Sequence, residues 1–231
     1  MLKSRFSLLL QIISILAVCT QAQENRPLVP DQPVERKIAG GESHTNRVKL
    51  EAGEFMRAFL EQKGIDLRLS LASPDGKQLV VINLTRPGGI ESLSAEPAAS
   101  GEYRLTVSAL APAHVVGEYE LRAERRAPSQ EDRQRITAEG MLVEANPLVN
   151  QGHTAPRAIE LLDKALLLWR TTGDRYWEAN TLNLLGRAHH SINLEEKAIE
   201  YAEQGLALQR QVKSRAGQAS ALNTIGTSQS A

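Results

Sequence analysis

Apolar and polar residues alternate along much of residues 35–124, and this pattern predicts short β-strands. Segment 65–71 carries isoleucine or leucine at every second position, with polar residues between them, as in a strand with one buried face. A Ser-Pro-Asp-Gly turn at 73–76 separates it from a return strand. The predicted strands include 47–52, 55–61, 65–71, 78–84, 101–109 and 117–123. About seven or eight short strands separated by turn residues predict an antiparallel β-sandwich.

The pattern becomes helical after residue 128. Ser129, with Asp132 three residues later, has the spacing of a capping box and predicts the start of a helix. Pro147 interrupts the helical pattern. Because proline removes a backbone hydrogen bond and clashes with the preceding turn, we expect this helix to stop or kink at Asn146.

Further helices are predicted from the residues at their ends. Thr154 caps the second helix, which ends at Gly173, where a left-handed residue is easily accommodated. Asp174 caps the third helix, a fourth follows a loop around Asn193, and the last begins near Ser214. We expect the last helix to pack through Ala219, Leu222, Ile225 and Gly226.

Residues 158–231 repeat themselves at a period of forty positions. Eleven residues are identical between the two copies without a gap: Ala158/Ala198, Ile159/Ile199, Glu160/Glu200, Leu166/Leu206, Leu168/Leu208, Arg170/Arg210, Arg175/Arg215, Ala179/Ala219, Leu182/Leu222, Asn183/Asn223 and Gly186/Gly226. A fixed period of this size indicates stacked helical units that bury their apolar faces against each other and present a binding surface. We expect the repeats to be incomplete at the C-terminus, with Leu222 and Ile225 available for self-association.

Residues 1–22 have the features of a secretory signal peptide. Two basic residues precede an apolar run at 6–18 that is too short to span a bilayer, and small residues follow near Ala22. The only cysteine, Cys19, lies in this segment. A lipoprotein signal at Cys19 is the alternative, which the bulky Val18 disfavours. We therefore expect an exported protein, periplasmic or extracellular, whose mature chain has no thiol.

The overall charge bears on the class of partner. Lysine plus arginine total 27, and aspartate plus glutamate also total 27. Binding of nucleic acid needs a clustered basic excess, so we expect no nucleic-acid partner, and we also expect no membrane span. The expected organisation is a signal peptide, a linker, a β-sandwich domain, a linker with the first helix, and the repeats: 1–22, 23–34, 35–124, 125–157 and 158–231.

The sequence shows no familiar catalytic motif. The mature chain has no cysteine nucleophile, no Gly-x-Ser-x-Gly, no His-Glu-x-x-His and no phosphate-binding glycine loop. His189 and His190 are adjacent, but neighbours on a helix point about 100° apart and cannot jointly face one ion. We expect no enzyme activity, no cofactor and no metal site.

One set of polar residues is a candidate peptide-binding groove. Asn180, Asn183, Arg187 and His190 are spaced along one helix face. The same face one period later carries Ser220, Asn223 and Thr227. Each asparagine amide can give a donor and an acceptor to an extended peptide, and Arg187 can contact an acidic group. In the alternative interpretation, the asparagines only solvate the helix and were kept by duplication.

Small and large residues in the helical part fall at positions that carry a family resemblance. They are Leu182, Leu185, Gly186, His189, Ala198, Ala202 and Gly205. This set resembles the signature of tetratricopeptide repeats, with His189 where tyrosine is usual and Gly205 where alanine is usual. The resemblance implies that the first helix of each repeat lines a concave groove, where the candidate residues would lie.

The sandwich segment also carries a resemblance, at 41–42, 73–76 and 100–103. These features resemble the jelly-roll-like pre-peptidase C-terminal domain of secreted bacterial peptidases, although Asn46 stands where an aromatic residue is usual. The order of segments resembles the N-terminal part of exported bacterial proteins that end in a caspase-like CHAT peptidase domain. The resemblance implies either a non-catalytic scaffold for a protein or peptide partner, or the regulatory or substrate-docking part of such a peptidase. A non-functional fragment is the third alternative.

Overall fold

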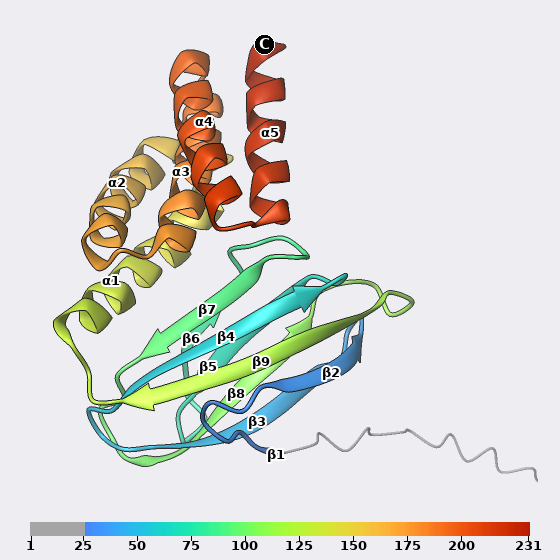
Figure 1. Cartoon of the computed structure of the whole chain (residues 1–231), viewed down its shortest axis with the longest axis vertical. Coiled ribbons are helices and arrows are strands. Elements are labelled where there is room, and N and C mark those ends of the chain that lie inside the picture. The colour runs from blue at the N-terminus through green and yellow to red at the C-terminus, as the bar shows by residue number, and fades with distance from the viewer. Residues whose placement is uncertain (1–25) are drawn as a thin grey trace, which may run out of the picture.

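Two β-sheets face each other and are followed by five α-helices in the computed structural model, which describes residues 26–231 (Figure 1). The strands are β1 (Arg26–Pro27), β2 (Val34–Ala39), β3 (Ser43–Leu50), β4 (Phe55–Lys63), β5 (Leu67–Ala72), β6 (Gln78–Ile82), β7 (Ile90–Ala95), β8 (Gly101–Ala109) and β9 (Val116–Arg126). The sheets have the orders β1-β3-β8-β5-β6 and β2-β9-β4-β7, antiparallel except that β1 runs parallel to β3. The predicted sandwich followed by helices is confirmed.

The alternation along the strands produces the core between the two sheets. On β5, Leu67, Leu69 and Leu71 are all buried, and the residues between them are not. From the other sheet, Tyr119 and Leu121 of β9 pack into the same cluster. The two-residue period of the sequence therefore corresponds to a real inner and outer face.

Apart from the two-residue β1, two strands were not predicted from the sequence, β2 and β7. β7 shows why the alternation fails there, because its buried residues include the polar Glu91, Ser92 and Ser94 as well as the apolar Leu93. Its inner face contacts the sandwich core and its outer face is covered by helices (Figure 1). A strand covered on both faces has no reason to alternate.

The helices are α1 (Gln130–Ala145), the 3-10 helix η1 (Asn146–Leu148), α2 (Ala155–Thr172), α3 (Arg175–His190), α4 (Glu195–Gln211) and α5 (Arg215–Gln229). Ser129 and Asp132 form the predicted capping box, and α1 ends before Asn146 as expected. Gly173 has a positive φ of 68°, and the Asp174 side chain accepts a hydrogen bond from the Trp177 backbone. The sequence predictions for these four helix ends are confirmed.

Thr154 is the N-cap residue of α2, as predicted, but its side chain does not cap the helix. The Thr154 hydroxyl donates instead to the carbonyls of Leu148 and Gln151, at 3.0 and 3.1 Å. Pro156 lies in the first turn of α2 and has no N–H that needs a cap. The hydroxyl therefore closes the preceding turn rather than the helix.

The predicted packing face of α5 is wrong. Its buried residues are Gly217, Ala221, Thr224 and Ser228, which pack toward α3 and α4. Ala219 and Gly226 are exposed, and Leu222 retains 53% of its surface. The identity of Leu222 with the buried Leu182 places both on the same helix face, but within residues 26–231 no further helix covers Leu222. Self-association through this face stays a prediction.

Buried polar contacts fix the helices against the outer side of β7. The Trp177 indole donates to Ser92 Oγ at 2.8 Å, and the Glu139 carboxylate accepts from Ser92 Oγ and the Ser94 backbone at 2.9 and 2.7 Å. Arg57 of β4 pairs with Asp174 at 2.9 Å, with both side chains about nine-tenths buried. These contacts set the position of the repeats relative to the sandwich.

No helix of residues 26–231 is both long and apolar enough to cross a membrane. The predicted signal peptide, its cleavage site and the lipoprotein alternative at Cys19 fall on residues outside the described ones.

Burial raises the pKa of Glu139 to about 7, in spite of the nearby Arg57 and the serine donors. A carboxyl group whose pKa is higher in the folded chain favours folding fully below its ordinary value of 4.5, and this contribution is lost as the pH rises to about 7. We expect Glu139 to account for up to about 3 kcal/mol of the resulting fall in the free energy of unfolding. Urea unfolding at several pH values, followed by tryptophan fluorescence, measures it.

The matched variant is Glu139→Gln, an amide that imitates the protonated carboxyl. We expect a shallower pH dependence than in the wild type, with the remainder due to Glu91, whose pKa is also raised to about 7 by burial. Glu144→Gln, the same substitution at an exposed position of the same helix, is the control for the substitution itself. Equal slopes for Glu139→Gln and the wild type would contradict the assignment.

Candidate functional site

A polar groove of about 530 Å³ lies along the C-terminal half of α3 and the facing side of α5. The residues that line it are Arg86, Asn150, Arg187, His190, Ser191, Asn193, Glu195, Ser220, Asn223, Thr224, Thr227 and Ala231. Its lining consists almost entirely of amides, hydroxyls and charged groups. We call this space the groove.

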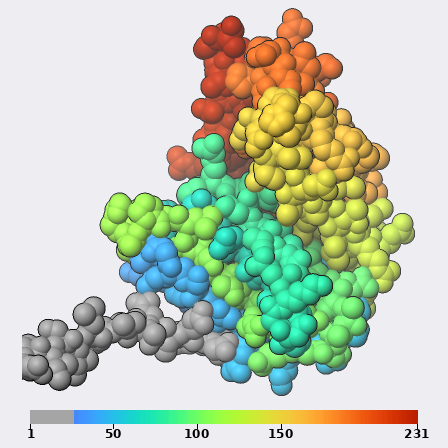
Figure 2. Space-filling view, turned by 180° about the vertical axis from the view of Figure 1, so that it is seen from behind, coloured from blue at the N-terminus to red at the C-terminus, as the bar shows by residue number. Residues whose placement is uncertain are grey.

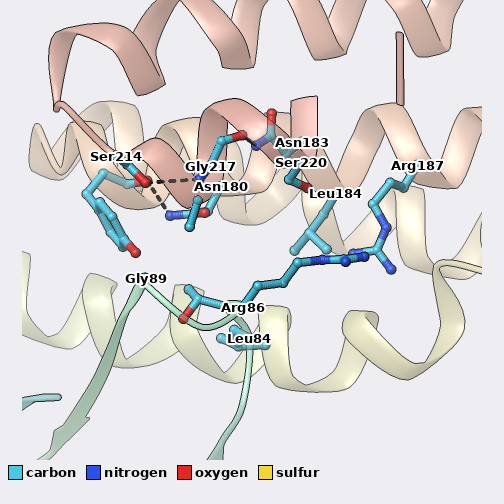
Figure 3. A pocket seen from close by; sticks show the side chains of 13 residues that line it. Leu84, Arg86, Gly89, Asn180, Asn183, Leu184, Arg187, Ser214, Gly217 and Ser220 are labelled. Atoms are coloured by element: carbon cyan, nitrogen blue, oxygen red, sulfur yellow. Dashed lines mark hydrogen bonds between the residues drawn. The ribbon is translucent and has the colours of Figure 1, made fainter. Parts of the chain in front are cut away.

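A loop of the sandwich closes one end of the groove. Residues 83–89, between β6 and β7, reach up to α5, as Figure 2 shows in teal below the red helix, and a Cβ atom at Gly88 would lie 3.9 Å from Ala216 Cβ. Beside the groove lies a separate pocket of about 40 Å³, which shares Arg86, Arg187 and Ser220 with it (Figure 3). The site is therefore built by both domains.

The loop is held firmly at both of its ends. The buried Glu91 carboxylate accepts from the backbone N–H groups of Leu84 and Thr85, at 3.0 and 2.7 Å. The Tyr176 hydroxyl of α3 accepts from the Ile90 N–H at 2.7 Å and lies 3.2 Å from the Ile90 carbonyl. These bonds tie the loop to β7 and to the first turn of α3.

Two arginines, Arg86 of the loop and Arg187 of α3, meet at the junction of pocket and groove (Figure 3). The pKa of Arg187 is lowered, first by burial and then by the charge of Arg86. Arg187 donates to Asn150 Oδ1 at 3.0 Å, a neutral partner. Among residues 26–231, no carboxylate forms an ion pair with either arginine. We call Arg86 and Arg187 the arginine pair.

Among the residues proposed from the sequence, Asn183 is not exposed to a ligand. Its side chain is only 4% exposed, and its amide donates to the Gly217 carbonyl of α5 at 3.0 Å. A Cβ atom at Gly205 would lie 2.3 Å from Asn183 Oδ1. The expectation of an accessible amide is wrong at this position, because α4 and α5 pack directly on it.

Asn180 is half-buried and also engaged. Its amide donates to the Tyr176 carbonyl at 2.8 Å, and its oxygen accepts from Gln209 Nε2 at 3.3 Å. The remaining candidates, Arg187, His190 and Asn223, do lie together on the groove, and Asn223 is exposed. The structure thus brings together three of the five residues as accessible groups.

The two adjacent histidines have separate environments. His189 is buried, its Nδ1 lies 2.9 Å from the Leu185 carbonyl, and its ring stacks on Tyr201 with 5.0 Å between centroids. His190 Nδ1 lies 2.7 Å from Glu195 Oε2 and 3.0 Å from Ser228 Oγ. Within residues 26–231, no three histidine, cysteine, aspartate or glutamate side chains are grouped as metal ligands would be.

Ser228, His190 and Glu195 contain the residue types of a hydrolase triad without its arrangement. A triad needs the nucleophile on one imidazole nitrogen and the acid on the other. Here the serine and the glutamate both contact Nδ1. Proton transfer from Ser228 through the ring to Glu195 is not possible in this geometry, so the cluster acts as a link between α3, α4 and α5.

Sequence reasoning missed Arg86, Asn150 and Glu195 as parts of the groove. Arg86 comes from the sandwich and Asn150 from the turn after η1, so neither lies in the repeated segment that pointed to the site. The only available signal for Arg86 was a turn-forming Arg-Pro-Gly-Gly at 86–89 in a domain with no other candidate chemistry.

Residues 153–211 match a family model described as "Tetratricopeptide repeat", which confirms the repeats predicted for this part of the chain. No curated protein matches the chain. Among solved structures, the chain is similar to Aeromonas hydrophila PliG, a periplasmic inhibitor of g-type lysozyme, at 14% identity over 44% of this chain and 99% of that one, with a TM-score of 0.35. It is also similar to the pre-peptidase C-terminal domain of a Bacillus anthracis collagenase, at 16% identity over 45% and 98%, with a TM-score of 0.34.

The repeated asparagines provide a matched pair for a stability test. We expect Asn183→Ala to lower the free energy of unfolding by about 1–2 kcal/mol, because it removes a buried interhelix hydrogen bond. Asn223→Ala, the same change at an exposed position, should shift it by no more than about 0.5 kcal/mol. Chemical unfolding of both variants checks this. A larger loss at Asn223 than at Asn183 would refute the assignment.

Proposed function

We propose that this protein is a non-catalytic scaffold whose groove binds an extended peptide segment of a partner protein. The support is the polar lining of the groove, on which donors and acceptors of α3 and α5 face one another. A peptide backbone requires such groups, since each residue brings one N–H and one carbonyl that must be paired. Stacked helical repeats commonly present concave surfaces of this kind.

The accessible groups of the groove have different roles in this proposal. Asn223, Ser220 and Thr227 contribute amide and hydroxyl groups from successive turns of α5. Arg187 supplies a positive charge from the opposite wall. The half-buried Asn180 and the buried Asn183 act indirectly, by fixing the helices that carry these groups. The peptide would lie in the groove, beyond the loop that closes one end.

The segment order supports two further elements of the proposal. The basic and apolar stretches of residues 1–22 support export to the periplasm or the exterior. A sandwich followed by repeats supports the alternative in which this chain is the docking part of a caspase-like CHAT peptidase. The coding sequence downstream of Ala231 distinguishes this alternative from a free-standing scaffold.

Export is tested by the N-terminus of the protein isolated from its native host. We expect mass spectrometry to find a chain that begins at Gln23, because small residues precede the expected cleavage after Ala22. A chain that retains Met1 would refute export by this signal. A lipid-modified Cys19 would replace it with the lipoprotein alternative.

Groove binding is tested with a peptide selected from a displayed random library on the full mature chain. We expect Asn223→Ala to weaken binding about two- to tenfold, the effect of one hydrogen bond. Arg187→Ala should weaken it more, and by an amount that falls as salt is added. Isothermal titration measures both.

The control is Glu203→Ala, an exposed change on α4 that does not line the groove. It should bind the selected peptide as the wild type does. Ser220→Trp places a large ring in the groove and should abolish binding. Full affinity in Ser220→Trp would show that the peptide binds elsewhere and would overturn the proposal.

A further inference from the structure

The arginine pair brings two positive charges to one site without an ion-paired carboxylate among the described residues. Arg86 and Arg187 come from different domains, line the same two spaces, and extend toward each other in Figure 3. Most other arginines of residues 26–231 with partly buried side chains have a carboxylate partner, such as Arg57 with Asp174. Two like charges brought together without a carboxylate repel each other.

The acidic groups around the pair contact other partners or lie too far away to form an ion pair with it. Glu195, on the groove, contacts His190. Glu91, below the loop, accepts from the backbone of Leu84 and Thr85. Burial raises the pKa of Asp66, the acid that feels the charge of Arg86, and Asp66 forms no ion pair with it. Among the described residues, none of these carboxylates lies within ion-pair distance of either arginine.

The pair is held in place rather than left to separate. Asn150 fixes one nitrogen of the Arg187 guanidinium at 3.0 Å. The Arg86 backbone belongs to the loop that Glu91 and Tyr176 hold at its two ends. The Arg187 donors are therefore already oriented for an anion, which lowers the cost of ordering them on binding, whereas the exposed Arg86 side chain is positioned through its backbone.

From this geometry we infer a carboxylate-binding site made jointly by Arg86 of the sandwich and Arg187 of the repeats. The inference rests on the proposed function, since the carboxylate belongs to the peptide in the groove. Guanidinium groups form paired hydrogen bonds with carboxylates, and two of them facing one space can share a single carboxylate. The amides and hydroxyls beside the pair suit a peptide backbone.

The consequence is that the sandwich is part of the receptor. A peptide bound through both arginines contacts both domains at once. The β6–β7 loop then selects for an acidic residue at one position of the peptide, while α3 and α5 bind its backbone. The carboxylate is either a side chain or the C-terminus of the peptide.

Three labelled dodecapeptides serve as probes for the full mature chain. The first alternates glutamate and serine and has an amidated C-terminus, the second has glutamine in place of glutamate, and the third is the second with a free C-terminus. Fluorescence anisotropy at about 50 mM salt, where screening is weak, measures their affinities. Arg86→Gln and Arg187→Gln are compared with Arg210→Gln, an exposed arginine of α4 outside the groove.

We expect Arg86→Gln and Arg187→Gln each to weaken the glutamate peptide about tenfold, the loss of a charge-assisted hydrogen bond. The loss of affinity in the double variant should be smaller than the product of the two single losses, because both arginines contact one carboxylate. The neutral amidated peptide and the Arg210→Gln variant should show no such loss. If only the third peptide responds, the C-terminus is the carboxylate source and the inference is also supported.

Stability separates binding from folding. Removing one charge of a repelling pair should leave the melting temperature of Arg86→Gln equal to the wild type or higher, while affinity falls. Unchanged affinity of Arg86→Gln for both carboxylate peptides overturns the two-domain site. If Ser220→Trp still abolishes binding in that case, the groove proposal survives. If Ser220→Trp binds as the wild type does, the groove proposal fails as well.

Discussion

The buried polar junction on the outer face of β7 is the interaction on which the rest of the molecule depends. Ser92 accepts from the Trp177 indole and donates to Glu139, so one hydroxyl joins the strand to two helices. Arg57 pairs with Asp174, the residue that also caps α3. Buried polar groups are costly unless each is paired, so this junction stabilises a single docking position. That position determines which residues of the two domains can meet.

The junction also explains which parts of the fold could be predicted from the sequence. Strands such as β5 have one face against the core and one toward solvent, so their composition alternates and they were predicted. On β7, the positions that would otherwise face solvent are occupied by Ser92 and Ser94, which are buried under helices. The repeats were predicted because periodic packing leaves a periodic sequence. The docking of one domain on the other leaves no periodic pattern in the sequence. Its contacts join residues more than forty positions apart.

The asparagines show the corresponding limit at the site. Asn183 and Asn223 are one period apart, which correctly placed them at equivalent positions of α3 and α5, the corresponding helices of successive repeats. Their environments differ because α5 packs on the first, and within residues 26–231 no helix packs on the second. The repeat in the sequence therefore predicts the direction in which a side chain points from its helix. Whether that side chain is exposed depends on the number of repeat units that follow it. Gly205 beside Asn183 was a usable sign, since a missing side chain in a helix often marks a close neighbour.

The arginine pair follows from the same junction by geometry rather than by local sequence. If the junction stabilised another docking angle, the loop at 83–89 would not reach α5, and Arg187 would face only its own repeat. Selection for stability alone would place an acid beside two approaching arginines, or replace one of them, because a second positive charge beside the partly buried Arg187 opposes folding. Natural proteins keep such unfavourable groupings where a ligand relieves them. The repulsion between Arg86 and Arg187 and the binding of a carboxylate are thus two aspects of one arrangement, and the β-sandwich takes part in recognition through its loop.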